Sequence, residues 1–202
     1  MLVDTGLGTE DVTQPGRRLG RINARTLGAA LKTEETASAQ IQALGFKTSD
    51  VRHILVTHLD MDHAGGLSDF PEAVLHLYRP EARLLGEKLT RKERSRYRAI
   101  QWAHGPKTEV YDRSGEPFFG FDAVRSLRGL PPELLMVPLS GHSEGHCGIA
   151  VRGERGWLLH AGDAYIHHGT MANPPKKSPL IERMIDRFNS WDRQEIERNR
   201  VR

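Results

Sequence analysis

The stretch THLDMDHAGG, residues 57–66, contains two histidines and two aspartates and ends on a pair of glycines. It directly follows the apolar residues 54–56, which are typical of a β-strand. Polar residues beside Gly-Gly usually form a turn that closes a strand, but this accounts for the composition and not for the spacing. His58, Asp60 and Asp62 alternate along the chain, so a loop leaving the strand can aim them at one point. His63 would then turn to a second point.

Length and composition suit one globular domain over residues 1–202, since 38% of the residues are hydrophobic and 27% are charged. No run of about 18 apolar residues occurs. The start, MLVDTGLG, lacks the basic and apolar regions of a secretory signal. We therefore expect no membrane segment and a cytoplasmic location. The single cysteine, Cys147, excludes an internal disulfide and a cysteine-rich zinc site, so a metal would have to be bound by His and Asp.

The charge balance is only modestly basic. The formal net charge is +3 and the pI is about 9.2, which reflects a small excess of arginine rather than a polycationic surface. The most basic segment, KLTRKERSRYR at residues 88–98, is typical of a solvated helix face. A phosphate-binding role is a minor alternative for this segment, and the sequence does not favour nucleic acid as a partner.

Strand and helix patterns alternate along the first half of the chain. Apolar runs of β type predict strands over residues 2–3, 51–57, 73–78, 134–137, 147–151 and 157–159. Apolar residues at helical spacing predict helices over residues 33–44, from Pro80 through Leu89, and from Pro179 toward the last residue. Gly45 is expected to end the first helix and Pro80 to open the second. The pattern indicates a layered α/β domain.

Two more ligand clusters follow predicted strands. GHSEGH, residues 141–146, comes after the strand over 134–137, and GDA, residues 162–164, comes after the strand over 157–159. A glycine just before a ligand permits unusual backbone angles and a close approach of metal or substrate. Each cluster alone is typical of a turn. Together they predict that three strand ends deliver imidazoles and carboxylates to one sheet edge, a mixture that suits hard and borderline divalent ions.

These clusters, together with VDTG at residues 3–6, resemble in order the successive motifs of the metallo-β-lactamase superfamily. Within it, the chain looks most similar to hydrolases of the N-acyl homoserine lactonase type. The resemblance covers most of the chain, and it is specific for fold and metal rather than for substrate. It implies an α/β fold, the αββα sandwich of this superfamily, shortened here at the N- and C-terminal ends.

The resemblance also implies a set of metal ligands. Two divalent ions, most simply zinc, would be bound by imidazoles and carboxylates. The first ion would be bound by His58, Asp60 and His142, the second by Asp62 and His63, and both by a bridging Asp163. His146, the second histidine of GHSEGH, is expected to be a packing residue or to support a ligand.

The chain departs from the family pattern at two ligand positions. The family has His-x-His-x-Asp-His, whereas this chain has a carboxylate, Asp60, in place of the second histidine. An extra anionic oxygen makes the site harder and would admit iron or manganese. The family's last metal histidine, which follows the C-terminal helix, has no counterpart. His167 and His168 are expected to be exposed or to line a pocket, so we expect weaker binding of the second metal.

The function implied by the resemblance is hydrolysis by a metal-bound hydroxide that opens an ester or lactone bond of a small molecule such as an N-acyl homoserine lactone. Asp62 would orient the hydroxide and carry its proton, and Tyr165 would donate a hydrogen bond to the substrate carbonyl. Three alternatives stay open: a thioester hydrolase of the hydroxyacylglutathione type, a phosphodiesterase that uses residues 88–98, and a noncatalytic metal-binding module. We do not expect β-lactam hydrolysis.

Overall fold

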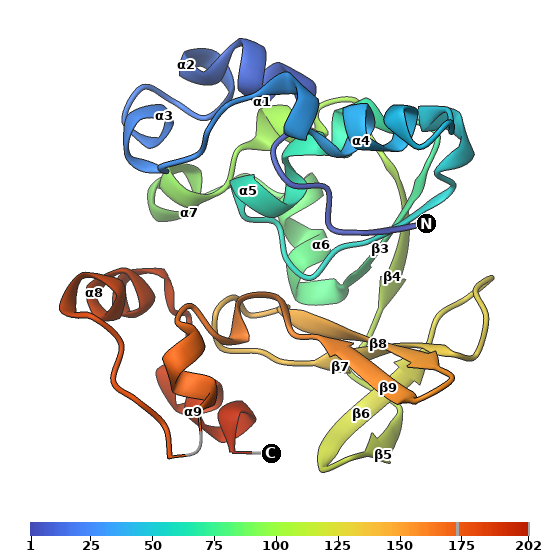
Figure 1. Ribbon diagram of the computed structural model, residues 1–202, viewed down its shortest axis with the longest axis vertical. Coiled ribbons are helices and arrows are strands. Elements are labelled where there is room, and N and C mark those ends of the chain that lie inside the picture. The colour runs from blue at the N-terminus through green and yellow to red at the C-terminus, as the bar shows by residue number, and fades with distance from the viewer. Residues whose placement is uncertain (173, 202) are drawn as a thin grey trace. The chain divides into compact units, whose positions relative to one another are not determined.

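A computed structural model describes residues 1–172 and 174–201, apart from the side chain of Ile181. The chain folds into two compact units (Figure 1). The first unit comprises Met1–Leu77 and Ala82–Val110, and the second comprises Tyr78–Glu81 and Tyr111–Arg202. Each is described by itself. The single domain expected over residues 1–202 stays a prediction.

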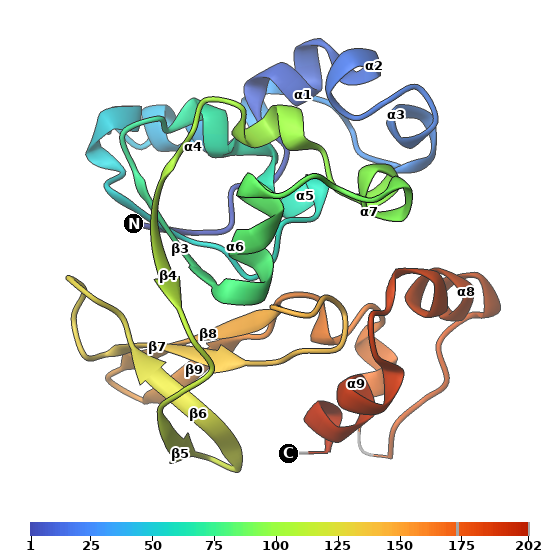
Figure 2. The ribbon, with the colours of Figure 1, turned by 180° about the vertical axis from the view of Figure 1, so that it is seen from behind.

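The first unit is built on a four-stranded sheet in the order β1-β2-β3-β4, of which β3 and β4 are labelled in Figure 2. Its strands are β1 (Leu2–Val3), β2 (His53–Leu55), β3 (Val74–Tyr78) and β4 (Lys107–Tyr111). β1 pairs with β2 and β2 with β3 in parallel. Parallel strands are usually buried on both faces, and this explains why consecutive residues 54–56 are all apolar and buried. The strands predicted over residues 2–3 and 73–78 are confirmed, and the one predicted over 51–57 is shorter.

Short helices connect the strands of the first unit. The α-helices are α1 (Thr9–Thr13), α2 (Pro15–Arg18), α3 (Asn23–Thr26), α4 (Ala37–Ala43), α5 (Met61–Ala64), α6 (Arg79–Gly86) and α7 (Arg91–Arg96). The 3₁₀ helices are η1 (Thr33–Glu35), η2 (Thr48–Asp50), η3 (Gly65–Asp69) and η4 (Ala99–Trp102). The helix predicted over residues 33–44 is therefore divided into η1 and α4. The division lies at Thr36, whose hydroxyl accepts the Ala39 amide as the N-cap of α4.

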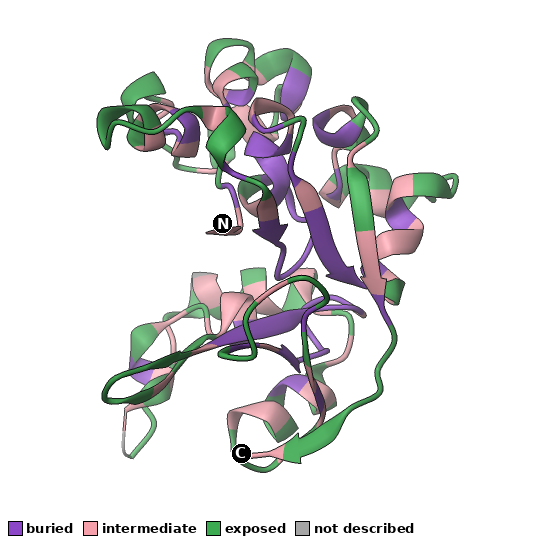
Figure 3. Cartoon of the chain, turned by 90° about the vertical axis from the view of Figure 1, so that its right-hand side faces the viewer, coloured by how far each residue is buried: buried purple, intermediate pink, exposed green. Residues whose placement is uncertain are grey.

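Most of the buried apolar residues of the first unit pack into one cluster, and the strands that contribute to it are largely buried in Figure 3. Ile54, Leu75 and Leu77 contribute from the strands, and each is at most 2% exposed. Trp102 of η4 belongs to the same cluster and anchors the segment before β4. The cluster fixes β2 and therefore the point at which residues 57–66 leave the sheet.

The second unit contains a five-stranded antiparallel sheet in the order β5-β6-β7-β8-β9. Its strands are β5 (Glu116–Phe118), β6 (Phe121–Ser126), β7 (Leu134–Pro138), β8 (Cys147–Gly153) and β9 (Gly156–His160). The three strands predicted from the sequence are β7, β8 and β9. β5 and β6 were not predicted, since most of their residues are exposed or half-buried and show no apolar run.

The second unit ends in two helices, α8 (Leu180–Asn189) and α9 (Arg193–Arg200), and also contains the 3₁₀ helices η5 (Gly162–Ala164) and η6 (His168–Met171). One continuous helix after Pro179 was expected, and this was wrong. The chain is extended at Ser190 and Asp192, and the Asp192 carboxylate caps α9 by accepting the amides of Gln194 and Glu195. Within the described part of the chain, the helices are all too short or too polar to cross a membrane.

Candidate functional site

After β2, residues 57–60 form a loop that leads into the four-residue helix α5, and Gly65 and Gly66 follow the helix. His58 is fully buried and its Nε2 lies 3.2 Å from Oδ2 of Asp60. Two ligands that bind one tetrahedral zinc at about 2.0–2.1 Å lie roughly 3.3 Å apart. The spacing of His58 and Asp60 therefore fits two donors to one ion. Asp62 and His63 lie on α5, where Asp62 is exposed and His63 half-buried.

Asp4, the aspartate of VDTG, organises this loop. Its carboxylate accepts the amide of Thr57 at 2.7 Å and the hydroxyl of Thr57 at 2.7 Å. It also bonds Nδ1 of His63 at 2.9 Å. A carboxylate on one ring nitrogen fixes the tautomer of a histidine and directs the other nitrogen to a metal. Asp4 has φ of 53°, an angle that aspartate adopts more readily than most residues do.

The two glycines that end the stretch allow a close backbone approach. A Cβ on Gly65 would lie 2.8 Å from the carbonyl oxygen of Gly6, and one on Gly66 would lie 2.9 Å from that of Thr5. The Gly66 amide donates to the Gly6 carbonyl at 3.1 Å. Alanine at either position would push the loop away from the turn after β1, so the pair serves to dock these two segments.

Asp60 forms a two-pronged ion pair with Arg96, the last residue of α7. Nε of Arg96 donates to Oδ1 at 2.5 Å and Nη2 donates to Oδ2 at 2.8 Å. The side chains are 11% and 20% exposed. Asp60 is also the N-cap residue of α5, but its side chain makes no capping hydrogen bond. The Asp60 carboxylate is therefore held by Arg96 and not by the amides that begin α5.

In the second unit, His142 and Asp163 repeat the spacing of His58 and Asp60. Nε2 of His142 lies 3.4 Å from Oδ2 of Asp163, with the histidine buried and the aspartate half-buried. Each follows a glycine with positive φ, 142° at Gly141 and 52° at Gly162. The unusual backbone angles predicted for these glycines are confirmed. Each unit thus contains one imidazole nitrogen and one carboxylate oxygen at the separation of two ligands that share an ion.

His146 uses both ring nitrogens within the second unit. Nδ1 bonds the carbonyl of Leu139 at 2.8 Å, and Nε2 accepts the amide of Asp163 at 3.0 Å. The ring is fully buried. His146 therefore connects the loop of His142 to the loop of Asp163, and this supports a packing and positioning role over ligation.

Helix α9 contacts both ligand loops of the second unit. The Asn199 amide donates to the carbonyl of Ser140 at 2.8 Å, and Nε of Arg200 donates to the carbonyl of Ala164 at 2.9 Å. A Cβ on Gly141 would lie 2.6 Å from the side chain of Ile196. The absence of a side chain at Gly141 therefore lets α9 approach the loop that carries His142.

Tyr165 and the paired histidines lie beyond Asp163. The Tyr165 hydroxyl donates to the carbonyl of Arg200 at 3.3 Å, so it is engaged by α9. His167 is half-buried and its Nδ1 accepts the Gly169 amide at 3.1 Å, while His168 is exposed. That bond leaves one nitrogen of the His167 ring for any other role.

Comparisons with known proteins identify relatives. Residues 1–175 match the metallo-beta-lactamase superfamily. A probable metallo-hydrolase of Mycobacterium tuberculosis is 42% identical over 202 residues, which are 100% of this chain and 64% of that protein. An N-acyl homoserine lactonase of Rhizobium radiobacter is 26% identical over 160 residues, which are 75% of this chain and 54% of the lactonase. This chain thus spans less than two thirds of the length of either relative.

Solved structures share the fold. An N-acyl homoserine lactone hydrolase with N-hexanoyl-L-homoserine bound at its catalytic metal centre matches with a TM-score of 0.67 and 17% identity, over 99% of this chain and 69% of that chain. A dizinc quorum-quenching lactonase matches with a TM-score of 0.58 and 16% identity, over 99% and 62%. The predicted fold class, a metallo-β-lactamase fold of mixed α/β type with two sheets, is confirmed.

Proposed function

Because the chain belongs to the metallo-beta-lactamase superfamily, we propose that it is a metal-dependent hydrolase that opens an ester or lactone bond of a small molecule. The observation that carries this proposal is the pair of donor spacings, 3.2 Å between His58 and Asp60 and 3.4 Å between His142 and Asp163. Imidazole and carboxylate at this separation suit a divalent ion. An N-acyl homoserine lactone is the proposed substrate type, since lactonases are among the relatives.

The proposed ligands are those expected from the sequence. One ion would be held by His58, Asp60 and His142, and the second by Asp62 and His63, with Asp163 shared between them. The bond from Asp4 to His63 supports this assignment, because a carboxylate on Nδ1 orients the ring and makes it a stronger metal ligand. Zinc is the proposed metal, and the additional carboxylate of Asp60 would also suit iron or manganese.

Bound divalent ions supply Lewis acidity and lower the pKa of water toward neutrality. The residues of the chain do the rest. Asp62 is exposed on α5 and is proposed to orient the attacking water and to carry its proton to the leaving alkoxide. Tyr165 is proposed to donate a hydrogen bond to the substrate carbonyl, for which its hydroxyl must leave the carbonyl of Arg200. The hydrolysed lactone would then leave as a hydroxy acid.

Two measurements on purified protein test the proposal. Elemental analysis should find a transition metal that a chelator removes, together with a fall in the thermal midpoint, because an ion bound only by the folded state stabilises it. A panel of lactone, ester, thioester and phosphodiester substrates should show turnover of the lactone or ester. Preference for the thioester would favour the hydroxyacylglutathione alternative. Bound metal without turnover would favour the noncatalytic module, and protein without metal would contradict the proposal.

A further inference from the structure

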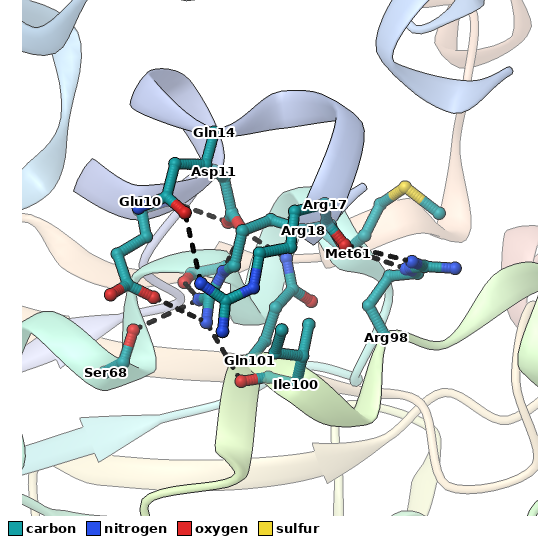
Figure 4. Close-up of polar contacts among 12 residues, drawn as sticks. Glu10, Asp11, Gln14, Arg17, Arg18, Met61, Ser68, Arg98, Ile100 and Gln101 are labelled. Atoms are coloured by element: carbon teal, nitrogen blue, oxygen red, sulfur yellow. Dashed lines mark hydrogen bonds and ion pairs between the residues drawn. The ribbon is translucent and has the colours of Figure 1, made fainter. Parts of the chain in front are cut away.

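A buried polar network lies behind the ligand loop of the first unit, formed by Asp11, Arg18 and Gln101 (Figure 4). Nε of Arg18 donates to Oδ1 of Asp11 at 2.8 Å, and Nε2 of Gln101 donates to Oδ2 of Asp11 at 2.9 Å. Asp11 and Gln101 are fully buried and Arg18 is 2% exposed. The Asp11 carboxylate also accepts the amide of Gly8 at 3.0 Å.

Two further hydrogen bonds of the network reach the two ends of α5. Nε2 of Gln101 also donates to the carbonyl of Met61 at 3.0 Å, and Nη2 of Arg18 donates to the carbonyl of Gly65 at 3.3 Å. Both partners of the Gln101 amide are pure acceptors, so the amide nitrogen must face them. Asp62 and His63 lie between the two carbonyls that the network holds.

Helix α5 depends on such contacts because it is one turn long. A helix of this length does not persist alone in water, and its last carbonyls have no donors within the helix. In addition to the network, Thr5 supports it, since the Thr5 amide and hydroxyl both donate to the carbonyl of His63 at 2.9 and 3.0 Å. The backbone that carries the two ligands is therefore fixed by tertiary hydrogen bonds.

Stability alone is a poor account of this network. Withdrawing two charges from water costs about as much as their attraction returns, so a buried ion pair contributes little net free energy of unfolding. Burial raises the pKa of Asp11, although bonds from Arg18 and Gly8 oppose the shift. Apolar side chains could fill the same space, but they could not donate to the carbonyls of Met61 and Gly65.

We propose that the Asp11–Arg18–Gln101 network positions Asp62 and His63 for the second metal by holding the carbonyls of Met61 and Gly65. This inference rests on the proposed function, since it assumes that these two residues bind that ion. The network would act on the backbone of α5, whereas Asp4 acts on the His63 ring. Loss of the network would then misplace Asp62 and His63 and lower the affinity for the second ion more than the affinity for the first.

The test variant is Gln101→Met, which keeps about the same side-chain length and removes the amide group that makes both hydrogen bonds. Metal-buffered zinc titration should show the weaker site filling at about tenfold higher free zinc, the lower range for loss of a supporting hydrogen bond, with the tighter site unchanged. Hydrogen exchange of the metal-free protein should be faster at the amides of residues 63, 64 and 66. Exchange in β7 and β8 should not change.

Tyr111→Phe is the matched control. Tyr111 is also fully buried and its hydroxyl accepts one backbone amide, that of Arg128 at 3.0 Å, within the second unit. The Tyr111→Phe variant should lose about as much stability as Gln101→Met, without faster hydrogen exchange at residues 63–66. If Gln101→Met leaves both the weaker zinc site and the exchange of these amides unchanged, or if it weakens both sites equally, the positioning role is overturned. If the parent binds no metal, the proposed function fails, while exchange still decides whether the network holds α5.

Discussion

The guanidinium of Arg96 holds both carboxylate oxygens of Asp60, at 2.5 and 2.8 Å. At this proposed ligand position the family pattern has a neutral imidazole, so Asp60 would add one negative charge to the site. Arg96 supplies one positive charge at the same place, and its planar fork fixes the orientation of the carboxylate. The pair is thus equivalent in net charge to the histidine it replaces.

The first prediction is that Asp60 and Arg96 act as a unit. Arg96→Met should lower the affinity of the tighter zinc site about tenfold in the parent, because the buried carboxylate loses the partner that orients it. In an Asp60→His background, Arg96→Met should have little effect or increase affinity, since the cation then has no carboxylate to neutralise. Zinc titration of the four proteins measures a coupling energy, which should exceed about 1 kcal/mol for a contacting pair. Additive effects would contradict the pairing.

Asp60 itself is tested by a second comparison. Asp60→His should fold and should shift preference toward zinc over iron or manganese, because the site loses a hard anionic oxygen. Asp60→Ala should lower the affinity for the first metal, because one ligand is lost and the positive charge of Arg96 is left near the ion. Titration with zinc and with manganese distinguishes the variants. Parent-like affinity in Asp60→Ala would show that Asp60 is not a ligand.

Asp4→Asn should lower zinc affinity about 10- to 100-fold, the range for a carboxylate behind a metal-binding histidine. Asparagine also tolerates the positive φ of this position, so the change tests the charge and the acceptors and not the backbone. Asp69→Asn is the control, because Asp69 also accepts an amide and a hydroxyl, both from Thr9. Similar zinc affinities in the two variants would exclude a special role for Asp4.

Asp163→Asn should lose more metal than His146→Gln, because Asp163 is the proposed ligand of both ions. His146→Gln should instead reduce the thermal midpoint, since it removes a buried ring whose nitrogens join two loops. Metal content by elemental analysis and thermal scans with and without chelator separate the two effects. Equal metal loss would contradict the assignment of Asp163 as the bridge.

The sequence predicted the ligand clusters because each is a local pattern: a strand, a glycine and alternate polar side chains. Apart from His146, it did not predict the residues that support them. Asp4 contacts Thr57 and His63 across 53 to 59 positions, and Asp11 contacts Gln101 across 90. Nothing in the composition around such residues specifies the partner. VDTG was read as a motif, and it is the only local signal that could have identified Asp4.

Element length explains the other differences. Helices α1 to α3 have four or five residues each, too few for helical periodicity to be visible. Residues 88–98 were read as a solvated helix face, and most of α7 is exposed, but Arg96 is directed to Asp60. Hydrophobic pattern therefore predicted the faces of elements, whereas buried ion pairs required the structure.

The last prediction concerns Glu93, the third residue of α7, the helix that ends at Arg96. Its carboxylate accepts the amide of Thr90 at 2.8 Å and a hydrogen bond from Arg83 at 2.7 Å. These contacts, the backbone bond first, lower the pKa of Glu93 to about 2. A depressed carboxylate pKa stabilises the folded state above the unfolded pKa, here about 4.5, and the contribution is lost as pH falls through about 2.

Glu93→Gln keeps the side-chain acceptor of the capping box but removes the charge, so it should lower the free energy of unfolding by about 0.5–1 kcal/mol near neutral pH. The difference from the parent, measured by urea unfolding, should stay constant down to about pH 4.5 and then narrow. Glu87→Gln is the control, because Glu87 lies 3.9 Å from the same Arg83 but is exposed. It should change stability by less than about 0.5 kcal/mol at any pH. If the stability difference between the parent and Glu93→Gln persists unchanged well below pH 4.5, the charge of the Glu93 carboxylate does not stabilise α7. The charge would then not help to hold Arg96 in place either.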